Sequence, residues 1–201
     1  MSQLKILLAS RSPRRRELLE QLAIDYETVD VEIDESVKSP IMPEVYVKEM
    51  AEKKAIKALS DFDHLITDQR LLLTADTTLS YAGKIIGKPE NEAHFIEIMR
   101  TLSNKTHTVF SALTLVGKQN GKARFVTMLS ESEVTFSVLP ETFIQNYWAS
   151  GEPCDKAGGY AIQGMMAGYI QSISGSYSGI MGLPLFELRK ALEEFDYFLM
   201  S

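Results

Sequence analysis

Several residue types are scarce in this chain, and each scarcity excludes a class of protein. The single cysteine, Cys154, excludes an internal disulfide framework and a zinc site built from several cysteines, and it suits a reducing compartment. The three histidines show no metal-ligand spacing and no His-Glu-x-x-His pattern. No apolar run approaches the roughly 20 residues needed to cross a bilayer, and the run at residues 4–9 is too short for a secretory signal. We therefore expect a cytoplasmic protein without a membrane partner.

Positive charge is also in short supply. The 21 Lys and Arg residues stand against 27 Asp and Glu residues, which gives a formal net charge of −6. This balance argues against broad attraction to nucleic acid, so any anion site must be a local basic pocket in an acidic protein. With 45% hydrophobic residues among its 201 residues, the chain suits one globular domain spanning 1–201.

Hydrophobic periodicity alternates between strand and helix patterns along the chain. We expect strands over residues 4–9, 26–31, 71–81 (interrupted at 76–78), 106–116, 122–138 and 169–173. We expect helices over residues 13–22, 43–59, 93–99, 140–149 and 183–195, and a glycine-rich loop over 157–160. Asn120-Gly121, between the two longest strands, is a pair that a type I′ hairpin turn prefers. That hairpin favours a mixed sheet in an α/β fold.

The most informative segment is LASRSPRRRELL at residues 8–19. The apolar run breaks at Ser10, and Ser12 and Pro13 suit the N-cap and first position of a helix. Three arginines follow in the first turn, where the helix dipole favours carboxylates instead. Cations beside free backbone N–H groups make sense where an anion binds, and a triphosphate is the natural candidate. The alternative is that the arginines only solvate the helix, since at most two of them can face one ligand.

Two acidic residues are candidates for chemistry. Asp76 comes at the end of the apolar run at residues 71–75, where a buried carboxylate is costly unless it pairs, binds a metal or reacts. It could equally cap a turn. Glu35 lies in an acidic stretch that could be merely solvated. Together, two carboxylates from separate loops could hold a Mg²⁺ ion that also bridges phosphate oxygens.

Three lysines recur near apparent loops or helices, namely Lys54, Lys88 and Lys156. Any one of them is more often a surface lysine than a ligand. Lys88 and Lys156 stand next to glycines, however, and a backbone without side chains can approach a phosphate. Residues 83–88 do not form a P-loop because the spacing is one residue short, and residues 175–179 lack the serine of a nucleophile elbow.

Taken together, these segments resemble the Maf family of nucleoside triphosphate pyrophosphatases. Seven short motifs carry the resemblance in order: LASRSPRR (8–15), ADT (75–77), GKP (87–89), SGEPCDKAG (150–158), YAIQG (160–164), GSY (175–177) and GLPL (182–185). Two positions depart from the usual pattern. Asn104 stands where glycine is common, and Met165-Met166 stand where smaller residues are usual, near the suspected base pocket.

The resemblance implies an α/β fold similar to that of the inosine-triphosphate pyrophosphatases. In that fold an elongated mixed sheet is flanked by helices, with two lobes around a central cleft. The implied reaction is cleavage between the α- and β-phosphates of a nucleoside triphosphate, with Mg²⁺ or Mn²⁺ as cofactor, giving a monophosphate and pyrophosphate. The resemblance also favours a homodimer.

The same resemblance assigns the site residues. Asp76 matches the catalytic residue, as general base or metal ligand, and Glu35 is the second expected metal ligand. The expected substrate-binding residues are Ser10, Arg14, Arg15, Lys54, Thr77, Lys88, Lys156 and Gln163. Gln163 could read a pyrimidine edge through its paired donor and acceptor.

Arg14, Thr77 and Gln163 match the subgroup that acts on dTTP and UTP. We therefore expect these nucleotides, and modified pyrimidine nucleotides, as substrates. Two alternatives stay open. One is a nucleotide-binding regulator of septum formation whose hydrolysis is incidental. The other is a Maf pyrophosphatase with a different base preference such as 7-methyl-GTP, although that subgroup usually has glutamine at the position of Thr77.

Overall fold

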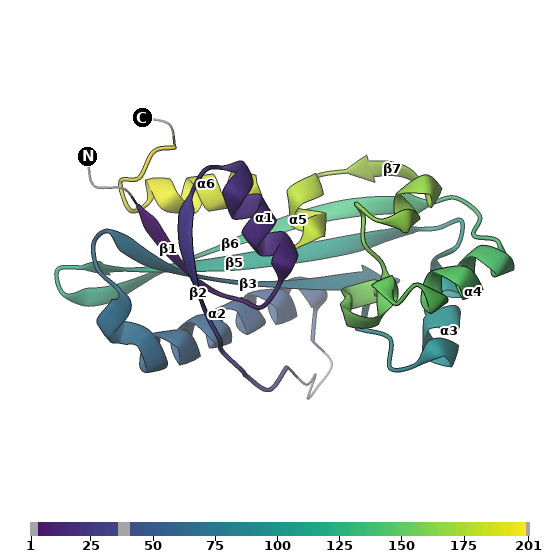
Figure 1. Ribbon diagram of the computed structural model, residues 1–201, viewed down its shortest axis with the longest axis horizontal. Helices are drawn as coiled ribbons and strands as arrows, with labels where there is room; N and C mark the ends of the chain where they lie inside the picture. Colours follow the sequence, from purple (N-terminus) through teal and green to yellow (C-terminus); the bar gives the residue numbers. More distant parts are fainter. Residues whose placement is uncertain (1–3, 36–40, 200–201) are drawn as a thin grey trace.

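The chain folds around a seven-stranded sheet with helices on both faces (Figure 1). The computed structural model describes residues 4–35 and 41–199. The strands are β1 (Lys5–Ala9), β2 (Asp25–Val29), β3 (Arg70–Tyr81), β4 (Lys84–Ile86), β5 (Thr106–Gln119), β6 (Lys122–Phe136) and β7 (Ile170–Ser174). The helices are α1 (Pro13–Gln21), α2 (Pro43–Phe62), α3 (Glu92–Leu102), α4 (Glu141–Ala149), α5 (Tyr177–Met181) and α6 (Leu185–Glu193). Short 3₁₀ segments are η1 (Asp63–Leu65), η2 (Glu152–Asp155), η3 (Ala157–Gly159) and η4 (Met165–Tyr169).

The sheet is mixed, as the sequence predicts. Its strand order is β2-β1-β3-β5-β6-β7, with β4 paired to β3. β1 runs parallel to both β2 and β3, whereas the pairs from β3 through β7 are antiparallel. Asn120 and Gly121 have φ values of 53° and 75°, which confirms the type I′ turn between β5 and β6.

β3 has strand partners along only part of one edge. β5 covers its other edge from Leu72 to Ser80. On the first edge, β1 pairs as far as Leu73, and β4 pairs from Leu79 onward. β4 must share the edge of β1 because β5 already pairs with Leu79 from the opposite side. In the strand pairings of the described chain, residues 74–78 therefore have no partner on this edge, and a ligand can approach the middle of a buried strand there.

The long helix α2 covers one face of the sheet below this open edge (Figure 1). Pro43 lies in its first turn, where the missing N–H costs no hydrogen bond. Its buried residues recur at helical spacing: Val47, Met50, Ala51, Ala55 and Ala58. Because this apolar stripe packs against β3 and β5, the rotation of α2 is set, and Lys54 comes to lie next to β3.

The opposite face is covered by α1, α5 and α6 (Figure 1). Leu19 of α1 and Leu188 of α6 pack there in one cluster with Leu8 of β1. A second cluster joins α3 and α4 to β5 and β6 at the far end of the sheet. Buried apolar side chains thus gather at both ends of the sheet, with polar side chains of β3 between them. No helix among the described residues is long and apolar enough to span a membrane.

The structure differs from the predicted elements in four segments. β3 runs unbroken through residues 76–78, so Asp76 lies within the strand and not at its end. Thr77 and Thr78 are β-branched and suit a strand, and the buried carboxylate is paired with Lys54. The strand β4 and the helix α5 are additional, because three and five residues are too few for a clear period. Most of the glycine-rich loop is a 3₁₀ segment.

Asn104 and Met165-Met166, which depart from the usual family pattern, lie in different structural environments. Asn104 has a φ of 55°, so it occupies a left-handed turn that glycine adopts freely and asparagine tolerates. Met166 is buried in the cluster with α3 and α4, and Met165 is exposed. Neither methionine is among the described residues that line the cavity presented next.

Candidate active site

A cavity of about 1100 Å³ opens at the unpaired edge of β3. Its walls come from the β1–α1 junction, the middle of β3, the β3–β4 hairpin and the loop that follows α4. All the site residues predicted from the sequence lie in this lining: Ser10, Arg14, Arg15, Glu35, Lys54, Asp76, Thr77, Lys88, Lys156 and Gln163. The lining holds seven Lys and Arg residues against four Asp and Glu residues. It is therefore a local basic pocket in an acidic protein.

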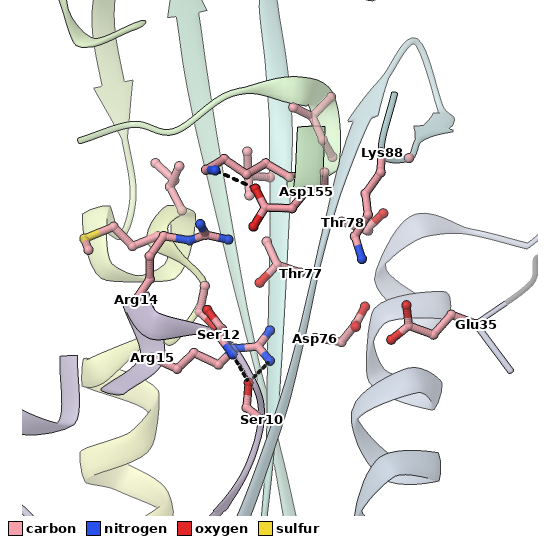
Figure 2. Close-up of a pocket in the computed structure, with 18 of the residues that line it drawn as sticks. Ser10, Ser12, Arg14, Arg15, Glu35, Asp76, Thr77, Thr78, Lys88 and Asp155 are labelled. Carbon is pink, nitrogen blue, oxygen red and sulfur yellow. Dashed lines mark hydrogen bonds and ion pairs between the residues drawn. The ribbon is translucent and has the colours of Figure 1, made fainter. Parts of the chain in front are cut away.

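Asp76 and Lys54 form the centre of the site. The Lys54 Nζ atom lies 2.7 Å from Asp76 Oδ1 and 2.5 Å from Glu35 Oε1, so one ammonium bridges two carboxylates. Asp76 is buried on β3, while Glu35 is about half exposed. In Figure 2 the Asp76 carboxylate points toward Glu35, with Lys88 on the same side of the cavity.

The two carboxylates differ electrostatically. Burial raises the pKa of Asp76 above its ordinary value, and Glu35 adds to this, although the charges of Lys54 and Arg15 oppose it. Burial acts on Glu35 as well, but Lys54, Lys88 and Arg15 together hold the pKa of Glu35 below its ordinary value. Asp76 is thus the carboxylate that takes up a proton more readily, and Glu35 is the one that stays ionised.

Neighbouring residues of β3 point to opposite faces of the sheet. Asp76 faces α2, where it meets Lys54, whereas Thr77 faces α5, where its hydroxyl lies 2.8 Å from that of Ser111. The lining includes both side chains because the cavity extends around the open edge of the strand. Figure 2 shows Ser10, Arg14 and Arg15 on the side of Thr77 that lies away from Asp76 and Glu35.

The arginines of α1 divide into two roles. Arg15 Nε donates to the Gly182 carbonyl at 2.8 Å, and its Nη1 donates to Ser10 Oγ at 3.1 Å. Burial lowers the pKa of Arg15, and the nearby charge of Arg14 lowers it further. Arg14 lies beside Asp155 in the cavity. Burial acts to raise the pKa of Asp155, but Lys156, with a smaller effect from the charge of Arg14, holds it below its ordinary value. Arg15 is therefore held in place by the fold, whereas Arg14 lines the cavity beside Asp155.

The start of α1 has neither a side-chain cap hydrogen bond nor an acidic residue in its first turn. The Ser12 N–H donates to Ser10 Oγ at 3.2 Å, which fixes the turn between β1 and α1. Ser12 is the N-cap residue and Pro13 the first residue of the helix, as predicted, but the Ser12 side chain makes no cap hydrogen bond. The first N–H groups of the helix therefore keep their capacity to bind an anion.

The loop after α4 closes the cavity from the far side. Lys156 Nζ donates to the Glu152 carbonyl and to Asp155 Oδ1, both at 2.6 Å. Gly158, with a φ of 69°, donates its N–H to the Gly87 carbonyl at 2.9 Å. This bond joins the loop to the turn that carries Lys88, so the two segments form one wall.

Gln163 lies in the same wall, on a segment that is held at Ala161. The Ala161 N–H donates to Tyr147 Oη at 3.1 Å, and Tyr147 Oη donates to Glu152 Oε1 at 2.5 Å. Burial, followed by the Glu152 contact, raises the pKa of Tyr147, so the phenol keeps its proton. This short chain of hydrogen bonds positions Gln163 without contacting its amide.

Among the lining residues that the sequence prediction did not name are Tyr46, Lys84 and Asp155. Tyr46 precedes Lys54 by eight residues on α2, which is about two turns and places both side chains on the same face of the helix. This spacing could have identified Tyr46 as a site residue. Its hydroxyl donates to the Glu35 carbonyl at 2.9 Å, while burial and the charges of Asp76 and Glu35 raise its pKa to about 12. Asp155 stands inside the SGEPCDKAG motif. Lys84 lies on the hairpin strand β4, which no pattern predicts.

Residues 5–195 match the family profile described as Maf-like protein, which is nearly the whole length of the chain. The chain belongs to the Maf family. Its relatives within this family include a protein named dTTP/UTP pyrophosphatase from Alkalilimnicola ehrlichii, which is 42% identical over 95% of this chain and 93% of the relative. Proteins with the same name from Acinetobacter baylyi and Bacillus cereus (strain B4264) are 42% and 40% identical, over 95% and 96% of this chain and 100% and 96% of the relatives.

The donor set at Asp76 fits the divalent metal that Maf membership implies. Glu35 and Asp76 come from separate elements and converge on one cation position, which the Lys54 ammonium takes in this structure. Across residues 4–35 and 41–199, no three His, Cys, Asp or Glu side chains gather as a metal site. Mg²⁺ commonly uses one or two carboxylates and completes its shell with water and substrate phosphates. These two carboxylates therefore suit a metal that binds together with a triphosphate.

Proposed function

We propose that this chain is a nucleoside triphosphate pyrophosphatase. It hydrolyses dTTP and UTP, and modified pyrimidine nucleotides, to the monophosphate and pyrophosphate. The observation that carries the proposal is a buried carboxylate, Asp76, at the centre of a basic cavity whose other groups can hold a triphosphate. The name shared by relatives about 40% identical over nearly the full chain supports this choice of reaction and bases.

The basic groups bind the phosphates. Arg14, Lys88 and the first N–H groups of α1 surround the end of the cavity, and Lys54 and Lys156 add charge from opposite walls. A guanidinium can hold two phosphate oxygens at once, whereas an ammonium acts as a point charge. Such preorganised groups supply much of the catalysis in phosphoryl chemistry because they stabilise charge that develops in the transition state.

Asp76 is the general base in this mechanism. Environments that push the pKa values of two acids apart mark different roles for them, and here Asp76 is shifted up while Glu35 is shifted down. Asp76 takes a proton from the attacking water, and Glu35 stays ionised as a metal ligand, with one Asp76 oxygen available to the same cation. Glu35 and one oxygen of Asp76 would hold a bound Mg²⁺ or Mn²⁺, which would supply positive charge to offset the charge that develops on the phosphates.

A panel of nucleoside triphosphates tests this function. Purified protein is incubated with each nucleotide and Mg²⁺ or Mn²⁺, and pyrophosphate and monophosphate are quantified. Selective release of pyrophosphate from dTTP and UTP is the expected result. Binding of nucleotide without cleavage would favour the regulator, and selective cleavage of 7-methyl-GTP would favour the other base preference.

We further propose that the protein works in the cytoplasm as a homodimer and without nucleic acid. The net charge of −6 and the single cysteine support the compartment and the absence of a nucleic-acid partner. Light scattering of the purified protein tests the dimer, and a mass corresponding to one chain would contradict it.

A further inference from the structure

A chain of three hydrogen-bonding groups runs from the cavity into the fold. Thr77 and Ser111 lie directly opposite each other on β3 and β5, and their hydroxyl oxygens are 2.8 Å apart. Ser111 Oγ is also 2.6 Å from the carbonyl oxygen of Gly179 in α5. Ser111 is 1% exposed, so it is screened from water.

The donor and the acceptor in each of these hydrogen bonds follow from the number of hydrogens that each group carries. The Gly179 carbonyl can only accept, so Ser111 must donate its single hydroxyl hydrogen to it. Ser111 then has only lone pairs left for its second contact, and the hydrogen between the two hydroxyls must come from Thr77. As a result, Thr77 has no hydrogen left for the cavity and can only accept there.

An acceptor at this position distinguishes ligand groups by polarity. dTTP and UTP differ at the sugar and at the 5-methyl group, but both bases present an N3–H donor between two carbonyl oxygens. Cytosine presents a bare N3 lone pair at the same place. A lone pair of Thr77 would pair with the N3–H of thymine or uracil and repel the N3 of cytosine.

We propose that Ser111 is a positioning residue that sets base preference through Thr77. By accepting a hydrogen bond from Thr77 and donating one to the Gly179 carbonyl, Ser111 fixes Thr77 as an acceptor for the N3–H of uracil or thymine. This inference rests on the proposed hydrolysis of dTTP and UTP. It adds a determinant of specificity that does not itself touch the nucleotide.

The test compares UTP with CTP in wild type and Ser111→Ala, using kcat/KM for pyrophosphate release at saturating Mg²⁺. In Ser111→Ala the Thr77 hydroxyl can turn its hydrogen into the cavity and donate to the cytosine N3. The UTP-to-CTP ratio of kcat/KM should then fall about tenfold, mainly through KM, which is the scale of one hydrogen bond. Ser130→Ala is the matched control, because Ser130 is a buried serine opposite Ser111 on β6 and should leave the ratio unchanged.

A double-mutant cycle with Thr77→Val separates positioning from a general structural effect. If Ser111 acts through Thr77, the double variant Thr77→Val/Ser111→Ala should have the same UTP-to-CTP ratio of kcat/KM as Thr77→Val alone. Thr77→Ser, which keeps the hydroxyl group, should retain the preference for UTP. Equal losses on UTP and CTP in Ser111→Ala, or an unchanged ratio, would overturn the inference. Wild-type protein that cleaves neither dTTP nor UTP would instead overturn the proposed function, so the two failures are distinguishable.

Discussion

Among single residues, Lys54 connects the two carboxylates of the proposed chemistry. It joins two carboxylates whose pKa values are shifted in opposite directions. A carboxylate as buried as Asp76 would be costly without such a partner. The pairing keeps a base at the centre of the cavity, and burial keeps its proton affinity above that of an exposed aspartate.

Replacement of Asp76 by asparagine separates catalysis from stability. We expect Asp76→Asn to lower kcat by about 10²-fold or more, the range for loss of a general base. A carboxyl group whose pKa is raised by folding stabilises the protein only below that pKa, so its ionised form is not a source of stability at neutral pH. The variant should therefore melt at or above the wild-type temperature by circular dichroism. Near-normal pyrophosphate release from dTTP would rule out the assignment.

The pH profile of kcat/KM tests the role of Lys54. Asp76 acts as a base only when deprotonated, so activity is lost as pH falls through its raised pKa. In Lys54→Met the leading influence that lowers this pKa is removed, and the acid limb of the profile should shift to higher pH. Lys84→Met is the control, since Lys84 lines the same cavity but is not among the charges that act on Asp76. An acid limb at the wild-type pH in Lys54→Met would contradict this role.

At the level of elements, the site depends on close contact between β3 and the loop after α4. Gly158 has a left-handed φ of 69°, and a Cβ atom there would lie 2.4 Å from Leu79 Cδ1. Glycine adopts this φ without strain, and the Leu79 side chain would have to move to admit a Cβ atom. Glycine thus favours the approach that brings the Lys156 loop onto the wall formed by Gly87.

The Gly158→Ala variant should therefore lose both stability and nucleotide affinity. We expect the free energy of unfolding to fall by about 1–3 kcal/mol, the cost of a strained backbone and a forced side chain, and KM for dTTP to rise. Gly168→Ala is the matched control, since nothing lies within 4 Å of its added Cβ and its φ is not in the left-handed region. Chemical denaturation measures the first effect and steady-state kinetics the second. Equal behaviour of the two variants would contradict this account.

The sequence predicts the long helices and strands, whose hydrophobic repeat is clear, and the site residues that lie within motifs. It does not predict contacts between side chains on neighbouring strands, because these depend on the register of the two strands. The pairing of Thr77 with Ser111 depends on how β3 slides against β5, and a slip of one residue would point Thr77 to the other face. β4 was missed because its turn uses Ala82, with a φ of 50°, where asparagine or aspartate would have signalled a type I′ turn. All ten predicted site residues line one cavity, although Glu35 and Lys54 lie outside the motifs. Lys54 comes to the open edge of β3 through the packing of α2, where it contacts Asp76 and Glu35.

For the molecule as a whole, His107 links stability to pH. It is 2% exposed, its Nε2 lies 2.8 Å from Tyr160 Oη, and its Nδ1 has no hydrogen-bond partner among residues 4–35 and 41–199. Burial lowers the pKa of His107 to about 4, below the ordinary value of 6.5. The neutral ring therefore contributes stability above pH 6.5 that is lost as pH falls toward 4, on the order of 3 kcal/mol for one proton.

Chemical denaturation at pH values between 7 and 4.5 measures this linkage. In His107→Phe the slope of unfolding free energy against pH should become shallower in this range, although the absolute stability falls through loss of the Tyr160 contact. The exposed His64 provides the control, and His64→Gln should keep the wild-type slope. A slope that does not change in His107→Phe would show that other groups cause the acid sensitivity.

The alternation of side chains along β3 separates the proposed base preference from the proposed catalytic carboxylate. Asp76 and Thr77 are neighbours in sequence, yet one belongs to the face of α2 and the other to the face of α5. A substitution at Thr77 or Ser111 can therefore alter which base is accepted while the carboxylate and its lysine keep their positions. A deletion of one residue before Asp76 would have the opposite effect, because it would exchange the two faces and lose both properties at once. We therefore expect single substitutions in this fold to change base preference, and insertions or deletions within β3 to abolish activity.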